Sequence, residues 1–109
     1  MGSTQDMPLN TTETYQSPNY PRRYPNNYYD KRAYRCQNNL TLSCPVVRIQ
    51  WSNGCWKDAL TVSGNRDQSV CGQTSLSYFV PGNTWLTIVF RTNFLIRDRG
   101  FQCTLTCPP

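Results

Sequence analysis

The segment Ser17–Asn27, SPNYPRRYPNN, decides how the rest of this 109-residue sequence is interpreted, together with Cys55-x-x-Asp58-x-Leu60-x-Val62 and Cys71-Gly72 farther along the chain. The first segment holds three prolines, and proline lacks the N–H that a central strand donates. We therefore expect residues 17–27 to form an extended, turning loop, with Tyr20 and Tyr24 packed at the end of a β-structure.

Short alternations of apolar and polar residues occupy most of the sequence from residue 40 onward. The alternating apolar positions are Leu40 and Leu42; Val47, Ile49 and Trp51; Leu60 and Val62; Leu86, Ile88 and Phe90; and Phe101, Cys103, Leu105 and Cys107. A period of two is typical of half-buried antiparallel strands, and no segment has a convincing helical period. Turn residues recur about every ten positions. The sequence therefore predicts an all-β sandwich or barrel.

The length and the cysteines indicate one disulfide-bonded domain. A chain of 109 residues suffices for a single core. Its six cysteines are accompanied by no histidine and no C-x-x-C, so disulfides formed in an oxidising compartment are favoured over zinc. We expect secretion, no cofactor and no membrane span, because no apolar run is long enough to cross a bilayer.

The N-terminal residues are polar and without periodicity. Met1-Gly2-Ser3 is similar to the start of an engineered sequence, so we expect residues 1–11 to be a disordered lead and residues 12–109 to be the domain. Asn10 and Asn39 each begin an N-x-[ST] triplet, which makes them candidate glycosylation sites.

The formal net charge is +5, from nine Arg and two Lys against six acids. Such a charge favours acidic partners such as sulfated glycans, anionic membranes or acidic protein patches. The alternative is that it only keeps the protein soluble. Nucleic acid is not expected as a partner of a disulfide-rich secreted domain.

The motifs and their order resemble the CUB domain family. After SPNYP and YPNN, the matching elements are Cys44-Pro45, Val47–Trp51, C-x-x-D-x-L-x-V, Cys71-Gly72, Leu86–Phe90 leading to Thr92-Asn93, and Gly100-Phe101. The resemblance implies a jelly-roll-like sandwich of two antiparallel sheets that binds rather than catalyses. The extra cysteines and the compact S-N-G-C loop are similar to CUB domains of arthropod and other invertebrate secreted proteases.

The resemblance also implies a disulfide between Cys55 and Cys71. For the other four cysteines, we expect Cys36 and Cys44 on one face of a strand that pairs antiparallel with the strand carrying Cys103 and Cys107. An antiparallel ladder then joins Cys36 to Cys107 and Cys44 to Cys103.

Many CUB domains bind calcium at one end and grip a lysine of a partner. Tyr20 and Asp58 match two positions of that family site, and Asn93 stands where a second Asp is usual. The family's Glu has no counterpart, because only Ser52-Asn53-Gly54 separates Trp51 from Cys55. The resemblance therefore implies a degenerate site without tight calcium binding. Asp58 either accepts hydrogen bonds from loop N–H groups or Tyr20, or contacts a ligand.

The sequence contains few residues in arrangements that could support catalysis. Without histidine, a Ser or Cys nucleophile lacks its usual base, and nothing places Asp58 beside Asp98 as a carboxylate pair. We expect no enzymatic activity.

Two segments are candidate binding surfaces. The first contains consecutive apolar residues beside cations in an expected loop: Phe94, Leu95, Ile96, Arg97 and Arg99, with Trp56 as a candidate neighbour. The second contains Arg22 and Arg23 and continues to Arg35 with interleaved tyrosines. The alternatives are that Phe94 and Ile96 are buried beneath their loop, and that the tyrosine-rich segment is a solvated edge.

These observations predict a non-catalytic module that binds an extracellular protein, as part of a secreted protease or as a free-standing secreted or venom-type protein. The alternative is a lectin-like or heparin-binding domain that uses its basic face. Membrane disruption is disfavoured by the missing amphipathic helix. The sequence does not indicate an oligomeric state.

Overall fold

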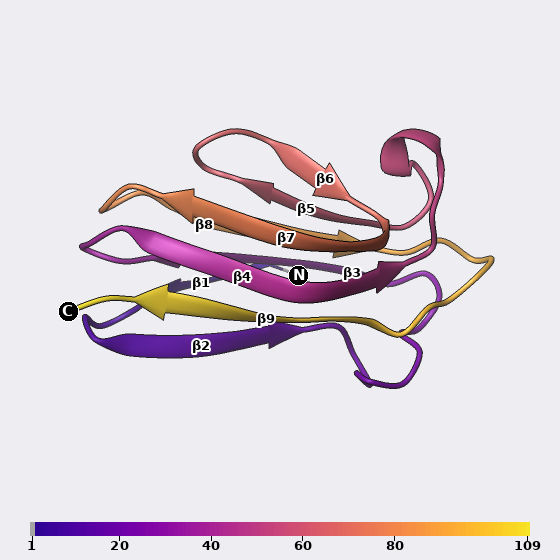
Figure 1. Cartoon of the computed structure of the whole chain (residues 1–109), viewed down its shortest axis with the longest axis horizontal. Coiled ribbons are helices and arrows are strands. Elements are labelled where there is room, and N and C mark those ends of the chain that lie inside the picture. Colours follow the sequence, from indigo (N-terminus) through magenta and orange to yellow (C-terminus); the bar gives the residue numbers. More distant parts are fainter. Residues whose placement is uncertain (1) are drawn as a thin grey trace.

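The alternating sequence pattern produces two β-sheets packed face to face, in a computed structural model that describes residues 2–109 (Figure 1). Sheet A has the order β1-β3-β8-β5-β6, and sheet B has the order β2-β9-β4-β7. The strands of sheet A are β1 (Gly2–Asp6), β3 (Tyr29–Arg35), β8 (Leu86–Arg91), β5 (Ala59–Ser63) and β6 (Gln68–Val70). The strands of sheet B are β2 (Thr11–Gln16), β9 (Gly100–Cys107), β4 (Leu40–Ile49) and β7 (Gly72–Val80). The prediction of an all-β sandwich is confirmed.

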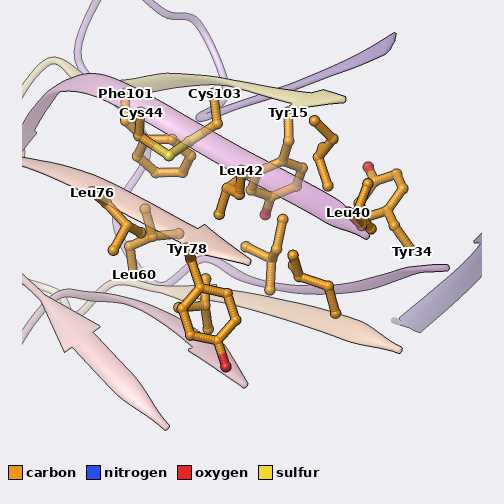
Figure 2. Packing of buried hydrophobic residues seen from close by; sticks show 14 of the residues in the cluster. Tyr15, Tyr34, Leu40, Leu42, Cys44, Leu60, Leu76, Tyr78, Phe101 and Cys103 are labelled. Carbon is orange, nitrogen blue, oxygen red and sulfur yellow. A yellow bond between two sulfur atoms is a disulfide. The ribbon is translucent and has the colours of Figure 1, made fainter. Parts of the chain in front are cut away.

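The core lies between the sheets and is built from the alternating positions. Of the apolar residues at the alternating positions, all are buried except one. Figure 2 shows part of the core that they form. The exception is Trp51, whose side chain is 69% exposed because β4 ends two residues earlier. An edge-to-face chain of rings crosses the core, with Phe90 4.9 Å from Phe101 and 5.1 Å from Tyr24 between centroids.

Strand β4 changes register in its middle. Leu40, Leu42 and Cys44 face inward, but the pairing with β7 resumes only at Val47. The two residues between them, Pro45 and Val46, are exposed and form a bulge, where a proline without an N–H is tolerated. The bulge returns Val47 and Ile49 to the core face.

The expectation of a disordered N-terminal lead is wrong. Residues 2–11 are not a disordered lead, because Gly2–Asp6 forms an edge strand and Met7 is buried; Met1 lies outside the described residues. The two sheets are antiparallel as expected except at this edge, where β1 runs parallel to β3. A polar edge strand carries no alternation to reveal it, and its stability comes from ladder hydrogen bonds and a bidentate Asp6–Arg35 contact at 2.7 and 3.2 Å.

Three disulfides are present, and they join the pairs expected from the sequence: Cys36–Cys107, Cys44–Cys103 and Cys55–Cys71. Cys44 and Cys103 face each other across the β4–β9 ladder, with their Cα atoms 4.2 Å apart. The pairing of Cys36 with Cys107 is expected because Cys36 and Cys44 are assigned to one strand. That assignment is wrong, because Cys36 follows β3 and does not lie on the strand of Cys44. Its bond to Cys107 therefore connects sheet A to sheet B.

The loops separate into two groups at the two ends of the sandwich. Loops 17–28, 50–58 and 92–99 gather at the right in Figure 1, and we call this the loop end. The other end carries the tight turns and the C-terminus. No helix within residues 2–109 has the length and apolar character needed to cross a bilayer.

The inter-sheet disulfide is expected to contribute more to stability than the one in the loop end. Replacing Cys36 and Cys107 by Ala opens a cross-link with a sequence separation of 71, against 16 for Cys55–Cys71. Chain entropy then predicts losses of about 4 and about 3 kcal/mol in the free energy of unfolding. Urea unfolding of both double variants measures the difference, and a larger loss for the Cys55/Cys71 variant would contradict it.

Candidate functional site

The loop end is held together first by contacts between Ser17 and the start of β9. Ser17 is buried, and its N–H donates to the carbonyl of Phe101 at 3.1 Å while its Oγ accepts the Phe101 N–H at 3.0 Å. Gly100 has φ +91°, and a Cβ there would lie 1.8 Å from Ser17 Oγ. Only glycine fits this position. The first and last sequence motifs of the chain therefore meet in space.

A buried hydrogen-bond hub, consisting of Tyr24 and Asp58, joins all three loops. The Tyr24 hydroxyl donates to Asp58 Oδ2 at 2.7 Å and accepts the Gln50 N–H at 3.0 Å. The other carboxylate oxygen, Oδ1, accepts the Asn93 N–H at 2.8 Å. Tyr24 and Asp58 are both fully buried, and Asp58 accepts hydrogen bonds from a loop N–H and a tyrosine. The tyrosine is Tyr24 rather than Tyr20.

Loop 92–99 is fixed at both of its bases. At one base, Asn93 donates to Asp58 and its carbonyl accepts the Asn27 N–H at 2.8 Å. At the other, the Asp98 carbonyl accepts the Tyr24 N–H at 3.1 Å. The segment between them, Phe94–Arg97, protrudes, and we call it the apolar tip.

The apolar tip is exposed to solvent. The exposed fractions of Phe94, Leu95 and Ile96 are 70%, 48% and 59%. These side chains are therefore not buried beneath their loop, which was the alternative left open by the sequence. The Leu95 N–H is bound by Asn93 Oδ1 at 3.1 Å, so the turn that presents them has a side-chain partner for its backbone.

Trp56 lies in the neighbouring loop and is 64% exposed. Its backbone is held by Arg91, whose guanidinium donates to the carbonyls of Cys55, Trp56 and Lys57 at 2.8–2.9 Å. Arg91 therefore stabilises the backbone of loop 50–58. The Lys57 ammonium lies 5.2 Å from the Trp56 ring centroid.

Four exposed arginines and a half-buried lysine belong to the same three loops. Within residues 2–109, none of them forms an ion pair: Arg22, Arg23, Lys57, Arg97 and Arg99. Of the two acids in these loops, Asp58 is buried, and Asp98 lies 3.9 Å from Arg48 Nε. The loop end therefore presents apolar side chains with an excess of positive charge.

The tyrosine-rich segment after Arg23 does not form one basic face. Tyr24 and Tyr34 are buried, while Arg32 contacts Asp30 at 3.3 Å and Arg35 contacts Asp6 at 2.7 Å. Alternation along β3 places Arg32 and Arg35 on opposite faces of sheet A. Arg22 and Arg23 remain exposed in loop 17–28, and their role in binding stays a prediction.

The residues at the family's calcium position do not fit calcium. The structure brings Asn93 to Asp58, but Asp58 already accepts two hydrogen bonds and the Asn93 side-chain oxygen accepts one. Tyr20 instead makes a turn back to Ser17. Residues 2–109 contain no cluster of three or more His, Cys, Asp or Glu side chains. Calcium takes about six to eight oxygen ligands, with carboxylates among them, so one engaged carboxylate is too few.

Sequence reasoning missed two residues that shape the loop end and left others as predictions. The sequence predicts only that Tyr24 packs at the end of the β-structure. Its place in a second Tyr-Pro unit was the available indication that it has a structural role. Arg91 is expected from the sequence only as a cation flanking the apolar segment 94–96, because nothing in a strand-terminal arginine indicates that it binds the carbonyls of another loop. Asn10 and Asn39 are exposed, and their glycosylation remains a prediction.

Replacing Tyr24 by Phe is expected to lower the free energy of unfolding by about 2–3 kcal/mol. The change leaves the buried Gln50 N–H and one Asp58 oxygen without a partner, and unsatisfied buried groups are costly. Tyr28→Phe is the matched control, because the half-buried Tyr28 ring also packs on Phe90. Urea unfolding of the two variants tests this, and equal losses would argue against the hub.

Alkaline pH is expected to destabilise the protein partly through the ionisation of Tyr24. Burial, and then the contact with the Asp58 carboxylate, raise the pKa of Tyr24 well above its ordinary value, while the Gln50 N–H acts in the opposite direction. A raised native pKa means that the unfolded chain loses its proton first, so stability is lost as pH rises above about 10. Each such tyrosine contributes a slope of at most about 1.4 kcal/mol per pH unit.

The unfolding free energy measured from pH 9 to 11, roughly across the ordinary tyrosine pKa, should therefore fall less steeply for Tyr24→Phe than for the wild type. Mass spectrometry after each measurement checks that the disulfides remain intact. Parallel slopes would show that Tyr24 ionisation does not contribute.

Comparison with known proteins agrees with this architecture. The family model described as CUB domain matches residues 5–105. A cubilin homolog from Drosophila melanogaster is 30% identical over 97 residues, which cover 83% of this chain and 3% of the homolog. The chain thus spans a small part of that relative's length.

Two solved structures share the fold. The full extracellular region of zebrafish Gpr126/Adgrg6 aligns with a TM-score of 0.81 and 19% identity, over 95% of this chain and 15% of that one. The CUB1-EGF-CUB2 domains of rat MASP-1 align with a TM-score of 0.80 and 19% identity, over 95% of this chain and 42% of that one. Because the family model covers nearly all of the sandwich, the chain belongs to the CUB domain family, whose members are generally non-catalytic extracellular protein-interaction modules.

Proposed function

We propose that this CUB domain is secreted and recognises another extracellular protein through its loop end. The observation that carries the proposal is the apolar tip, three consecutive exposed apolar side chains between two hydrogen-bonded bases. Exposed apolar groups beside arginine are typical of the centres of protein interfaces. Binding requires no metal and no catalytic residue.

The fixed bases of loop 92–99 favour binding by reducing its entropic cost. Asn93 and Asp98 are both tied to the other loops, so the tip is presented on a supported frame. Ordering a mobile loop on association costs free energy, and a preorganised loop avoids part of that cost. Phe94 and Trp56 are aromatic and exposed, which makes them the strongest candidates for the hot spot.

The charge of the loop end indicates the kind of partner. Of its two acids, Asp58 is buried and engaged, so it cannot grip a lysine from outside, and the partly exposed Asp98 lies 3.9 Å from Arg48. Its other charges are four exposed arginines and the half-buried Lys57. The partner is therefore expected to present carboxylates or other anions around an apolar pocket, the reverse of the lysine ligands that calcium-type CUB sites take.

The proposal also includes the kind of protein in which this domain occurs. The similarity to the cubilin homolog and to modular extracellular proteins supports a role as one module among several, as in a secreted protease. A free-standing secreted protein of the venom type would use the same surface. The heparin-binding alternative has less support, because the Arg32 and Arg35 side chains are paired with acids and lie on opposite faces.

Photo-crosslinking tests the proposal at the residue level. A photoreactive phenylalanine analogue at position 94 is expected to give a discrete protein adduct in extracellular fluid from the source organism. The same analogue at position 79 is the control, because Phe79 is 50% exposed but lies on β7, outside the loops of the loop end.

The adduct should be lost when Arg97 and Arg99 are replaced by Gln, since the anionic rim of the partner then loses its counter-charges. Adducts of equal yield from positions 94 and 79 would show that the loop end is not the binding surface. If the protein binds a heparin column at low salt but not at physiological salt, the interaction is non-specific electrostatic attraction and not binding at a glycan site.

A further inference from the structure

We propose a second activity for the loop end: it binds peripherally to the surface of an anionic phospholipid membrane, with the apolar tip and Trp56 inserted among the headgroups. This activity is separate from protein recognition and does not rest on it. Three features of the structure support it: the shape of the surface, its charge and the hydrogen bonding of its backbone.

The apolar groups of the loop end project instead of lining a groove. Phe94, Leu95 and Ile96 are adjacent in sequence and all largely exposed, and Trp56 projects from the loop beside them. Three hollows of the described surface lie away from the loop end, one at the opposite end near Leu9 and two beside β7. A projecting apolar tip fits a deformable interface, whereas a protein partner must supply a matching cavity.

The charges of the loop end match an anionic surface. Arg22, Arg23, Lys57, Arg97 and Arg99 lie in its three loops without an ion pair among residues 2–109. Asp58 is buried, and Asp98 lies near Arg48. Cations beside apolar residues are the pattern by which peripheral proteins combine attraction to anionic lipids with burial of apolar area.

The bases of the apolar tip are hydrogen-bonded within the protein, and among the backbone groups of the tip itself the Leu95 N–H has a partner, so insertion is limited to the hydrated headgroup region. The N–H groups of Asn93 and Leu95 are bound by side-chain oxygens, and the Asp98 carbonyl is bound by Tyr24. In the loop beside it, Arg91 binds three carbonyls. Unsatisfied backbone groups are the main obstacle to burying a loop in lipid. Such an anchored loop inserts without an amphipathic helix, and it stays at the interface without crossing the bilayer.

The test is co-sedimentation of the purified protein with vesicles, at low and at physiological salt. We expect binding to vesicles of phosphatidylcholine mixed with phosphatidylserine to be at least about tenfold stronger than binding to phosphatidylcholine alone, and to weaken with salt. Tryptophan fluorescence should shift to the blue on binding, and Trp56→Phe should abolish most of the shift. Trp85 lies outside the loop end, and Trp51, which is exposed in loop 50–58, is replaced by Phe in the background so that Trp56 is the reporter.

Paired variants separate insertion from simple charge attraction. Phe94→Ser/Ile96→Ser should abolish the blue shift and weaken binding at physiological salt at least about tenfold. Arg97→Gln/Arg99→Gln should weaken binding to anionic vesicles by a similar factor. Phe79→Ser and Arg66→Gln remove an exposed apolar side chain and an exposed cation outside the loop end, and they should leave binding unchanged. Equal unfolding midpoints verify that all variants are folded.

Three results would overturn the inference. The first is no sedimentation with anionic vesicles at low salt, and the second is sedimentation that Phe94→Ser/Ile96→Ser does not change, which is adsorption by charge only. The third is equal loss of binding in the Phe79 and Arg66 controls. A protein adduct from position 94 together with any of these results would leave protein recognition as the sole activity of the loop end.

Discussion

The buried hydrogen bond between Tyr24 and Asp58 is the contact on which the loop end of this domain depends. It joins the proline-rich loop to the C-x-x-D loop, and the second carboxylate oxygen holds Asn93 in the third loop. A carboxylate without solvent is stable only with such partners. Its orientation toward the interior also removes it from the surface, and the exposed chemistry of the loops is therefore apolar and cationic.

The opposite end and the centre of the sandwich are stabilised by different means. Cys36–Cys107 joins the residue after β3 to the last residue of β9, and Cys44–Cys103 joins two neighbouring strands within the core (Figure 2). Between them and the hub, Phe90 and Phe101 pack edge to face. These two disulfides, together with the hub and Cys55–Cys71 at the loop end, allow the short tip between Asn93 and Asp98 to expose apolar side chains without weakening the core.

The loop end illustrates how one CUB scaffold can serve a different ligand chemistry. The position that supplies a calcium ligand in many relatives is occupied here by an aspartate that binds its own loops. The exposed groups of the loop end are the apolar tip, Trp56 and the arginines around them. Both proposals, for a protein partner and for anionic lipid headgroups, rest on this combination of apolar and cationic groups.

The sequence by itself determined the domain family and the strands β4, β5, β8 and β9, because inward positions such as Leu86, Ile88 and Phe90 must alternate on a half-buried sheet and the motifs keep their order. It did not single out β2, β3, β6 or β7, nor β1, since a polar edge strand has no alternation and depends on pairing with β3. Nor did it distinguish Tyr24 from Tyr20 as the partner of Asp58, or an exposed from a buried tip. Those outcomes depend on how three loops distant in sequence pack against one another, and only the tertiary structure decided them.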